Sequence, residues 1–147
     1  MGAWGFKALE SDAGLDVVDF LAENFPENNK LKLSEIISRM RGHLLGTDFD
    51  DIDFFYDNTA MALVELYFMF KDAGNLEHYE KLKNIKAFTA DSESLEYLLK
   101  YLMDIKNEVP DEDGDREIVD LWRDSKEWEN WNKHLGELIQ RLNNEIN

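Results

Sequence analysis

The stretch of residues 58–73 constrains the fold more than any other part of the chain. Apolar side chains fill almost every position over 60–70, and Glu65 is the one charge in the middle of the stretch. A helix that is apolar on all sides has to lie inside the protein, where other helices cover it. The sequence therefore predicts a central helix over about 58–73, ended by Gly74 or Asn75.

Apolar residues also recur three or four positions apart along most of the remaining chain, which is the spacing of one helix face. Aspartates at 12, 91 and 115 stand where they can cap helices. On the first helix the expected inner face consists of Leu15, Val18, Leu21 and Phe25. We expect further helices over about 13–25, 32–45, 75–87, 92–105, 116–122 and 128–142.

The pattern as a whole predicts an all-α fold: one domain over residues 1–147, built as a bundle of about six to seven helices around the central one. A chain of this length can bury a proper core. It contains no cysteine, so disulfides and thiol chemistry are excluded. We see no signal peptide and no apolar run of about 18 residues, so we expect a cytoplasmic protein that does not enter a membrane.

The first residues form a distinctive opening in which Gly2 and Gly5 bracket Trp4. Glycine adopts positive φ without strain, so these two positions allow sharp turns on either side of the indole. A large apolar side chain this early indicates that the segment is docked on the core. Trp4 is then either a structural plug for one end of the bundle or one lip of a binding groove.

This opening resembles that of the small bacterial proteins of domain-of-unknown-function family 4259, which usually reads Trp-Gly-x-Gly-x-Phe-Glu-Asn-Asp. The chain keeps Gly2, Trp4, Gly5, Glu10 and Asp12 of the family pattern. It departs from the pattern at three positions, which are Lys7, Leu9 and Ser11.

The C-terminal third is similar to the same family. Residues 117–122 read Glu-Ile-Val-Asp-Leu-Trp and precede Trp128, Trp131 and Leu135, like the family's Glu-Leu-x-x-Leu-Trp element and its following tryptophan helix. The resemblance implies a fold and a bacterial, cytoplasmic setting. It implies no activity.

The net charge is −16, from 32 acidic and 16 basic residues, and it is spread over both halves of the chain. A field of this sign repels nucleic acid and anionic membranes, and it steers basic partners toward the protein. Solubility alone is the other explanation of such a surface.

Two segments concentrate the acids, at 47–58 and 107–115. The first fails the spacing of a calcium loop, because counting from Asp48 puts Ile52 at position five and Thr59 at position twelve. The second also lacks the full spacing, so we assign no metal site. We instead predict an interaction surface made of Trp4, Asp48, Asp50, Asp51, Asp53, Asp111 and Asp113.

Motifs of catalysis are absent from the sequence. There is no phosphate loop, dinucleotide fingerprint or nucleophile elbow, and His43, His78 and His134 are isolated in sequence. We therefore predict no catalytic residue and no cofactor. Glu65 is the one titratable group of interest: it is either buried, and then a possible acid, or exposed on a solvent-facing strip, which we favour.

Three functions are compatible with these observations. The favoured one is a non-enzymatic, acidic protein-binding module, such as an immunity or antitoxin-like protein, with a basic protein partner. The second is a small hydrolase or ligand-binding domain with a pocket near Glu65 and the tryptophans. The third is a structural protein that associates with itself as a homo-oligomer.

Overall fold

The computed structural model describes residues 5–24, 29–40, 57–110, 114 and 116–146. Helices dominate this part of the chain, which confirms the predicted fold class. The α helices are α1 (Asp12–Asn24), α2 (Leu33–Met40), α3 (Asp57–Ala73), α4 (Ser92–Lys106), α5 (Glu117–Arg123) and α6 (Trp128–Ile146). The other elements are the short 3-10 helices η1 (Ala8–Glu10) and η3 (Glu80–Leu82) and the strands β1 (Lys30–Lys32) and β2 (Ala87–Thr89).

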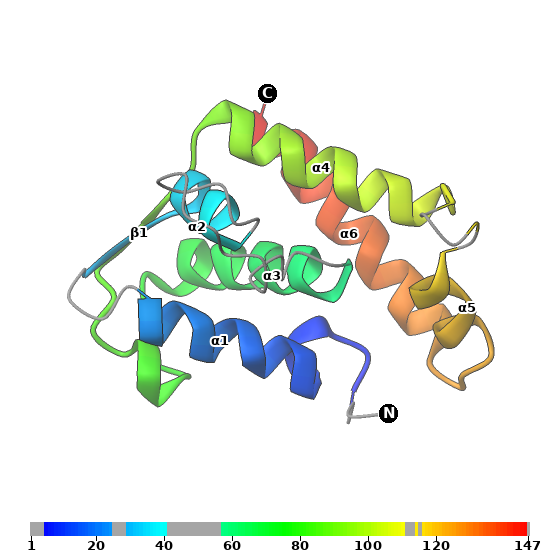
Figure 1. Cartoon of the computed structure of the whole chain (residues 1–147), viewed down its shortest axis with the longest axis horizontal. Coiled ribbons are helices and arrows are strands. Elements are labelled where there is room, and N and C mark those ends of the chain that lie inside the picture. Colours follow the sequence, from blue (N-terminus) through cyan, green and yellow to red (C-terminus); the bar gives the residue numbers. More distant parts are fainter. Residues whose placement is uncertain (1–4, 25–28, 41–56, 111–113, 115, 147) are drawn as a thin grey trace.

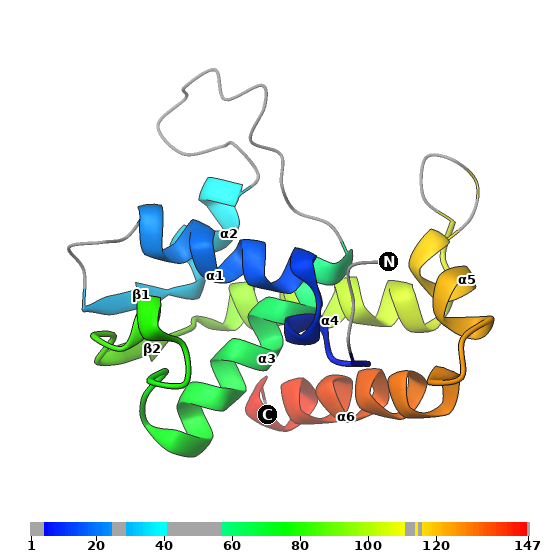
Figure 2. The ribbon, with the colours of Figure 1, turned by 90° about the horizontal axis from the view of Figure 1, so that it is seen from below.

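Helix α3 is the centre of the molecule, as its composition predicts. Every residue from Thr59 to Phe68 is buried. Figure 1 shows α3 between α1 and α4, and Figure 2 shows α6 on the side of α3 away from α1. The helix gives way to Gly74, whose φ of +77° is a left-handed conformation that favours glycine at a helix end.

Helix α1 is rotated relative to the predicted orientation. Ser11 rather than Asp12 caps its start, because the Ser11 hydroxyl accepts a hydrogen bond from the Gly14 amide at 3.1 Å. The same hydroxyl donates a hydrogen bond to the Ala8 carbonyl at 2.6 Å. Gly14 faces the core, and Leu15, which was expected inside, is 36% exposed. The buried face consists of Gly14, Val17, Val18 and Leu21.

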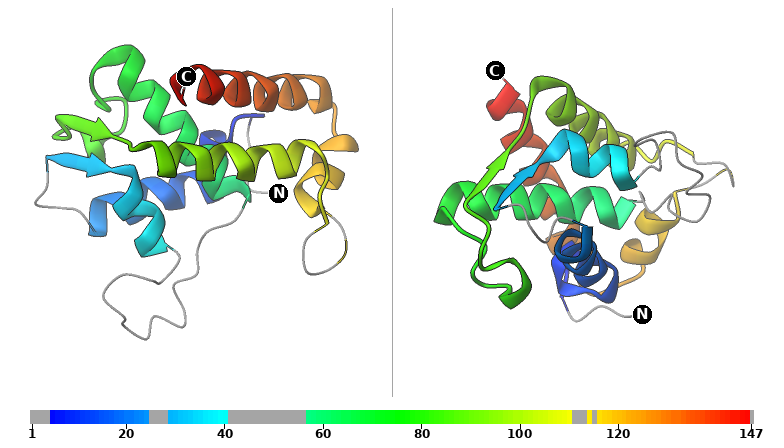
Figure 3. Two further views of the ribbon diagram at one scale, coloured as in Figure 1. Left: turned by 90° about the horizontal axis from the view of Figure 1, so that it is seen from above. Right: turned by 60° about the vertical axis from the view of Figure 1, so that its left-hand side comes forward.

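The predicted helix over 75–87 is wrong. This segment forms η3 and then strand β2, which pairs in parallel with β1 through Lys30–Ala87, Leu31–Phe88 and Lys32–Thr89 (Figure 3). In each strand only the middle residue, Leu31 or Phe88, is buried. A two-stranded ladder with this alternation packs one side chain per strand into the core, which the helical spacing of the sequence does not indicate.

The C-terminal helices are joined by stacked tryptophans. The Trp131 side chain is 1% exposed and lies between the rings of Trp122 and Trp128, with centroid distances of 6.0 and 5.7 Å. The stack therefore packs α5 against α6. Asp91 caps α4 as predicted, through the Ser94 amide at 2.8 Å. Arg116 holds the N-cap position of α5, and Asp115, which was expected to cap this helix, lies outside the described residues.

None of the helices in the described part of the chain is both long and apolar enough to cross a membrane.

Candidate functional site

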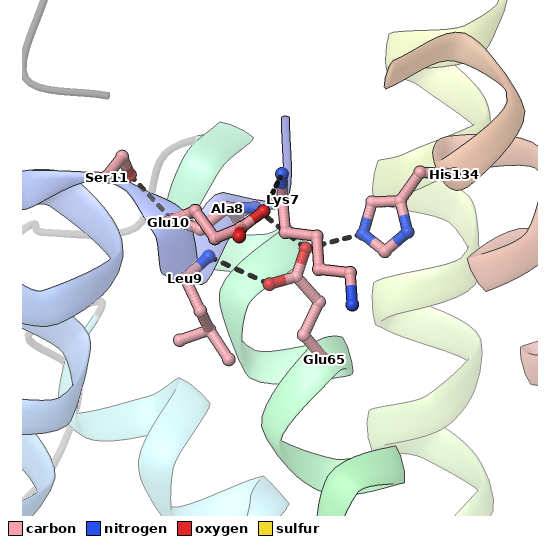
Figure 4. A network of polar contacts seen from close by, with 7 residues as sticks. All are labelled: Lys7, Ala8, Leu9, Glu10, Ser11, Glu65 and His134. Carbon is pink, nitrogen blue, oxygen red and sulfur yellow. Dashed lines mark hydrogen bonds and ion pairs between the residues drawn. The ribbon is translucent and has the colours of Figure 1, made fainter. Parts of the chain in front are cut away.

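The buried carboxylate of Glu65 joins the N-terminal segment to the central helix. Its side chain is 5% exposed, and its oxygens accept the backbone amides of Ala8 and Leu9, each at 2.8 Å (Figure 4). The sequence favoured an exposed Glu65, and this prediction is wrong. The amides at the start of a 3-10 turn have no partner within the turn, and a buried carboxylate is stabilised by such donors.

A third group reaches the same carboxylate from helix α6. His134 Nε2 lies 2.7 Å from Glu65 Oε2, and the histidine ring meets the edge of Phe6 at a centroid distance of 5.6 Å. We call the Glu65 carboxylate with the Ala8 amide, the Leu9 amide and the His134 imidazole the N-terminal clamp. His134 looked isolated because its partner lies 69 positions away in the sequence.

Close packing around Gly14 holds the clamp's amides in place. A Cβ atom built on Gly14 would lie 2.0 Å from the Ala8 carbonyl oxygen and 2.7 Å from the Leu9 Cα. The turn itself is tied by the Glu10 carboxylate, which accepts the Lys7 amide at 3.2 Å. The described part of the opening is therefore docked, through these polar contacts and through the buried side chains of Ala8 and Leu9. Trp4, on which the prediction of docking rested, lies outside the described residues.

An open cleft of about 450 Å³ lies beside the clamp. Its walls come from η1, α3, α6 and the turn before η3, and apolar side chains such as Phe68, Met69 and Leu138 make up much of the lining. The polar residues in the lining include Lys7, Glu10, Glu65, His78, Tyr79 and His134.

One charged pair in the cleft is already satisfied. Arg141 donates to both carboxylate oxygens of Asp72, at 2.8 and 3.0 Å, and its guanidinium lies 4.1 Å from the centroid of the Phe68 ring. The hydrogen bond between them lowers the pKa of Asp72 and raises the pKa of Arg141. These two residues form one wall of the cleft and leave little net charge there.

Tyr79 lines the cleft on the side of the turn before η3, and its pKa is raised. Burial raises the pKa of its phenol, and the negative charges of Glu65 and Glu10 raise it further. The Tyr79 and His78 rings are perpendicular to each other, and their centroids lie 4.9 Å apart. No hydrogen-bond partner for the Tyr79 hydroxyl occurs among the described residues, so this group remains available to a ligand.

The tryptophans line a different hollow. It measures about 220 Å³ and is bordered by Trp128, Trp131 and Asn132, and it shares no lining residue with the larger cleft. The structure therefore separates the two features that the sequence placed in one pocket.

The interaction surface predicted from the sequence cannot be placed. All seven of its residues lie outside the described part of the chain: Trp4, Asp48, Asp50, Asp51, Asp53, Asp111 and Asp113. Within residues 5–24, 29–40, 57–110, 114 and 116–146, no group of three or more histidine, aspartate or glutamate side chains is arranged to hold a metal ion.

Sequence reasoning missed the clamp, and of the cleft it anticipated only a pocket near Glu65. A usable signal existed, because a single carboxylate in an otherwise apolar, central helix requires donors from elsewhere in the chain. That signal identifies Glu65 as a residue that needs partners. It does not identify the partners, since backbone amides carry no sequence signature.

Together these features define a small helical domain with an acidic surface, a buried carboxylate–histidine clamp and an open cleft beside it. The chain belongs to the family described as Domain of unknown function (DUF4259), whose model matches residues 2–134. The predicted family is thereby confirmed, and the match extends from the opening segment to the histidine of the clamp. Comparison with curated proteins and with solved structures gave no match.

Proposed function

We propose that this protein is a non-enzymatic binding module for a basic protein partner, in the manner of an immunity protein or an antitoxin. The net charge of −16 supports the proposal, because such a field accelerates encounter with a positively charged surface.

The observation that carries the proposal is the outer face of helix α1. Its acids are spaced by four, three and four positions, which places them along one side of a helix. The buried residues Val17, Val18 and Leu21 lie on the opposite side. We call this face the acidic stripe; it consists of Asp12, Asp16, Asp19 and Glu23.

The stripe combines charge with exposed apolar surface. Leu15 stands at its edge and is 36% exposed, and Phe20 lies half-buried along its other edge. Protein interfaces commonly combine apolar side chains with polar and charged ones. Asp19 is paired with Lys81 at 2.6 Å, and because both side chains are exposed a base of the partner can replace Lys81 at small cost.

Catalysis has less support than binding. The Glu65 carboxylate accepts two backbone amides and lies 2.7 Å from His134 Nε2, so both of its oxygens are already engaged in holding the opening segment. Among the described residues that line the cleft there is no serine, threonine or cysteine to act as a nucleophile. The cleft does favour ligand binding, which we retain as the second candidate function.

Charge variants test the proposal. Partners captured from the source cell are identified, and the association rate of the purified partner is measured against salt for wild type and for a variant carrying Asp12→Asn, Asp16→Asn and Glu23→Gln. We expect the variant to associate about tenfold more slowly at low salt, and the wild-type rate to fall as salt screens the field.

The matched control removes the same number of exposed charges elsewhere, through Glu93→Gln, Glu96→Gln and Glu129→Gln. It should change the rate about twofold at most. A wild-type rate that does not depend on salt, or an equal effect of both variants, would overturn the assignment to α1. The acidic segments predicted from the sequence are tested separately, by replacing Asp50, Asp51, Asp111 and Asp113 with asparagine.

A further inference from the structure

The cleft beside the clamp has the shape of a site for a small organic group. Its volume of about 450 Å³ falls within the usual range of ligand pockets. Leu9, Phe68, Met69 and Leu138 supply an apolar lining, which suits an aliphatic stem.

The acceptors that remain free in the cleft favour a positive charge at the end of such a stem. Arg141 is neutralised by Asp72, and Glu65 is held by its three donors. Glu10 accepts only the Lys7 amide among the described residues, so most of its lone pairs are available. Glu10, Glu65 and Tyr79 all line the cleft, and the charges of the two carboxylates add to burial in raising the pKa of the Tyr79 phenol.

The geometry of these acceptors distinguishes an ammonium from a guanidinium. A guanidinium binds best to a carboxylate that offers both oxygens. Glu65 has both oxygens occupied, and one oxygen of Glu10 already accepts an amide. An ammonium is a compact charge that needs only single, separate acceptors, such as one Glu10 oxygen and the Tyr79 hydroxyl.

The chain's own Lys7 has to share this space. Lys7 lines the cleft together with Glu65 and His134, and no carboxylate among the described residues forms an ion pair with it. A flexible lysine at the mouth of the cleft can swing outward, although its charge opposes the entry of a second ammonium.

The cleft and the acidic stripe are linked through neighbouring elements. Helix α1 contacts both η1 and η3, and Lys81 of η3 pairs with Asp19 of the stripe at 2.6 Å. We infer that the cleft receives a lysine side chain of the basic partner, with its ammonium held by Glu10 and the Tyr79 hydroxyl and its stem on the apolar lining. This inference rests on the proposed function, because it supplies the contact that anchors the same partner.

A titration with small probes tests the inference without the partner. Nα-acetyl-lysine amide is added to ¹⁵N-labelled protein, with Nα-acetyl-norleucine amide as the uncharged probe of similar stem and Nα-acetyl-arginine amide as the guanidinium probe. We expect saturable shifts of the amides of residues 7–10 and 78–79 with the lysine probe, and much weaker binding of the other two.

Single substitutions in the cleft identify the side chains that bind the lysine probe. Glu10→Gln should weaken binding of the lysine probe about fivefold, and Tyr79→Phe should weaken it while keeping the ring. Lys7→Gln should strengthen it, because a like charge is removed. Circular dichroism and the unshifted remainder of the amide spectrum show that each variant is folded.

The inference is overturned if norleucine amide binds as tightly as the lysine probe, if the arginine probe binds more tightly, or if Glu10→Gln has no effect. The stripe variant separates this outcome from failure of the proposed function. No stripe residue lines the cleft, so the stripe variant should bind the lysine probe like wild type. If the lysine probe fails to bind while association of the partner still depends on salt, the inference about the cleft is overturned and the proposed binding at the acidic stripe stands.

Discussion

Replacing Glu65 by alanine breaks the N-terminal clamp completely. The substitution removes the acceptor of three hydrogen bonds, those from the Ala8 amide, the Leu9 amide and His134 Nε2. Ala8 and Leu9 are only 4% and 6% exposed, so their amides cannot simply turn to solvent. Two buried donors are left without a partner.

The cost follows from these contacts. An unsatisfied buried donor destabilises a protein by about 1–3 kcal/mol, so two amides and the lost packing of the side chain give about 3–6 kcal/mol for Glu65→Ala. Glu65→Gln keeps the stem and one acceptor oxygen, but its amide group points a donor at another donor. We expect about 1–3 kcal/mol for this variant.

Urea unfolding followed by circular dichroism measures both values, and amide hydrogen exchange at Ala8 and Leu9 locates the effect. Glu93→Gln is the control, because this side chain is exposed and its loss should change stability by less than about 0.5 kcal/mol. If Glu65→Ala cost less than about 1 kcal/mol and left exchange at both amides unchanged, the clamp would contribute little and our reasoning would be refuted.

Three further predictions concern packing and capping. Gly14→Ala should destabilise the protein by about 1–3 kcal/mol in thermal unfolding, because the new methyl group would overlap the Ala8 carbonyl. Gly136→Ala should instead stabilise the protein by about 0.5–1 kcal/mol, because a Cβ atom at this helical position has nothing within 4 Å. Equal effects at the two sites would contradict the packing argument. Trp131→Ala should cost about 3–5 kcal/mol, since the indole is fully buried in the tryptophan stack; a loss below about 1 kcal/mol in urea unfolding would show that the stack is not part of the core. Asp91→Ala should cost about 1 kcal/mol at neutral pH. The hydroxyl and amide of Ser94 lower the pKa of Asp91, so this contribution is present above the unfolded pKa of about 3.9 and is lost as pH falls through the lower folded value; a wild-type advantage that did not shrink as pH falls below about 3.9 would argue against it.

The central helix could be predicted from sequence because its signal is local and strong. Residues 60–70 of α3 are apolar on all sides apart from Glu65, and only a buried helix suits such a pattern. The cap at Asp91 is equally local, since its partner Ser94 is three positions away.

The segment over 75–87 misled the prediction for a physical reason. Its apolar residues Leu76, Tyr79, Leu82 and Ile85 are three positions apart, a spacing that tight turns satisfy as well as a helix does. The strand that follows depends on β1, which lies 57 positions earlier in the chain. Pairing at that distance leaves no trace in a local pattern.

The candidate site was beyond local reasoning for the same reason. Glu65 could be recognised as an isolated charge, but its burial depends on amides of the opening segment and on a histidine near the other end. Leu15 was misplaced because the position of α1 is set by Gly14 against the Ala8 carbonyl, a contact between backbones that hydrophobicity does not report.

The long separations within the N-terminal clamp also bear on how long a folded molecule survives. Its three hydrogen bonds join positions 56, 57 and 69 residues apart, so two large loops of chain must close before any of them forms. Loop closure costs entropy in advance of the contact, and we expect the clamp to assemble after the folding barrier has been crossed. Interactions formed that late leave the folding rate unchanged and slow unfolding. In a chevron plot, Glu65→Gln would then move the unfolding limb and spare the folding limb. The clamp would then lengthen the lifetime of the native state. It would also increase resistance to proteases that cleave opened molecules faster than those molecules reclose.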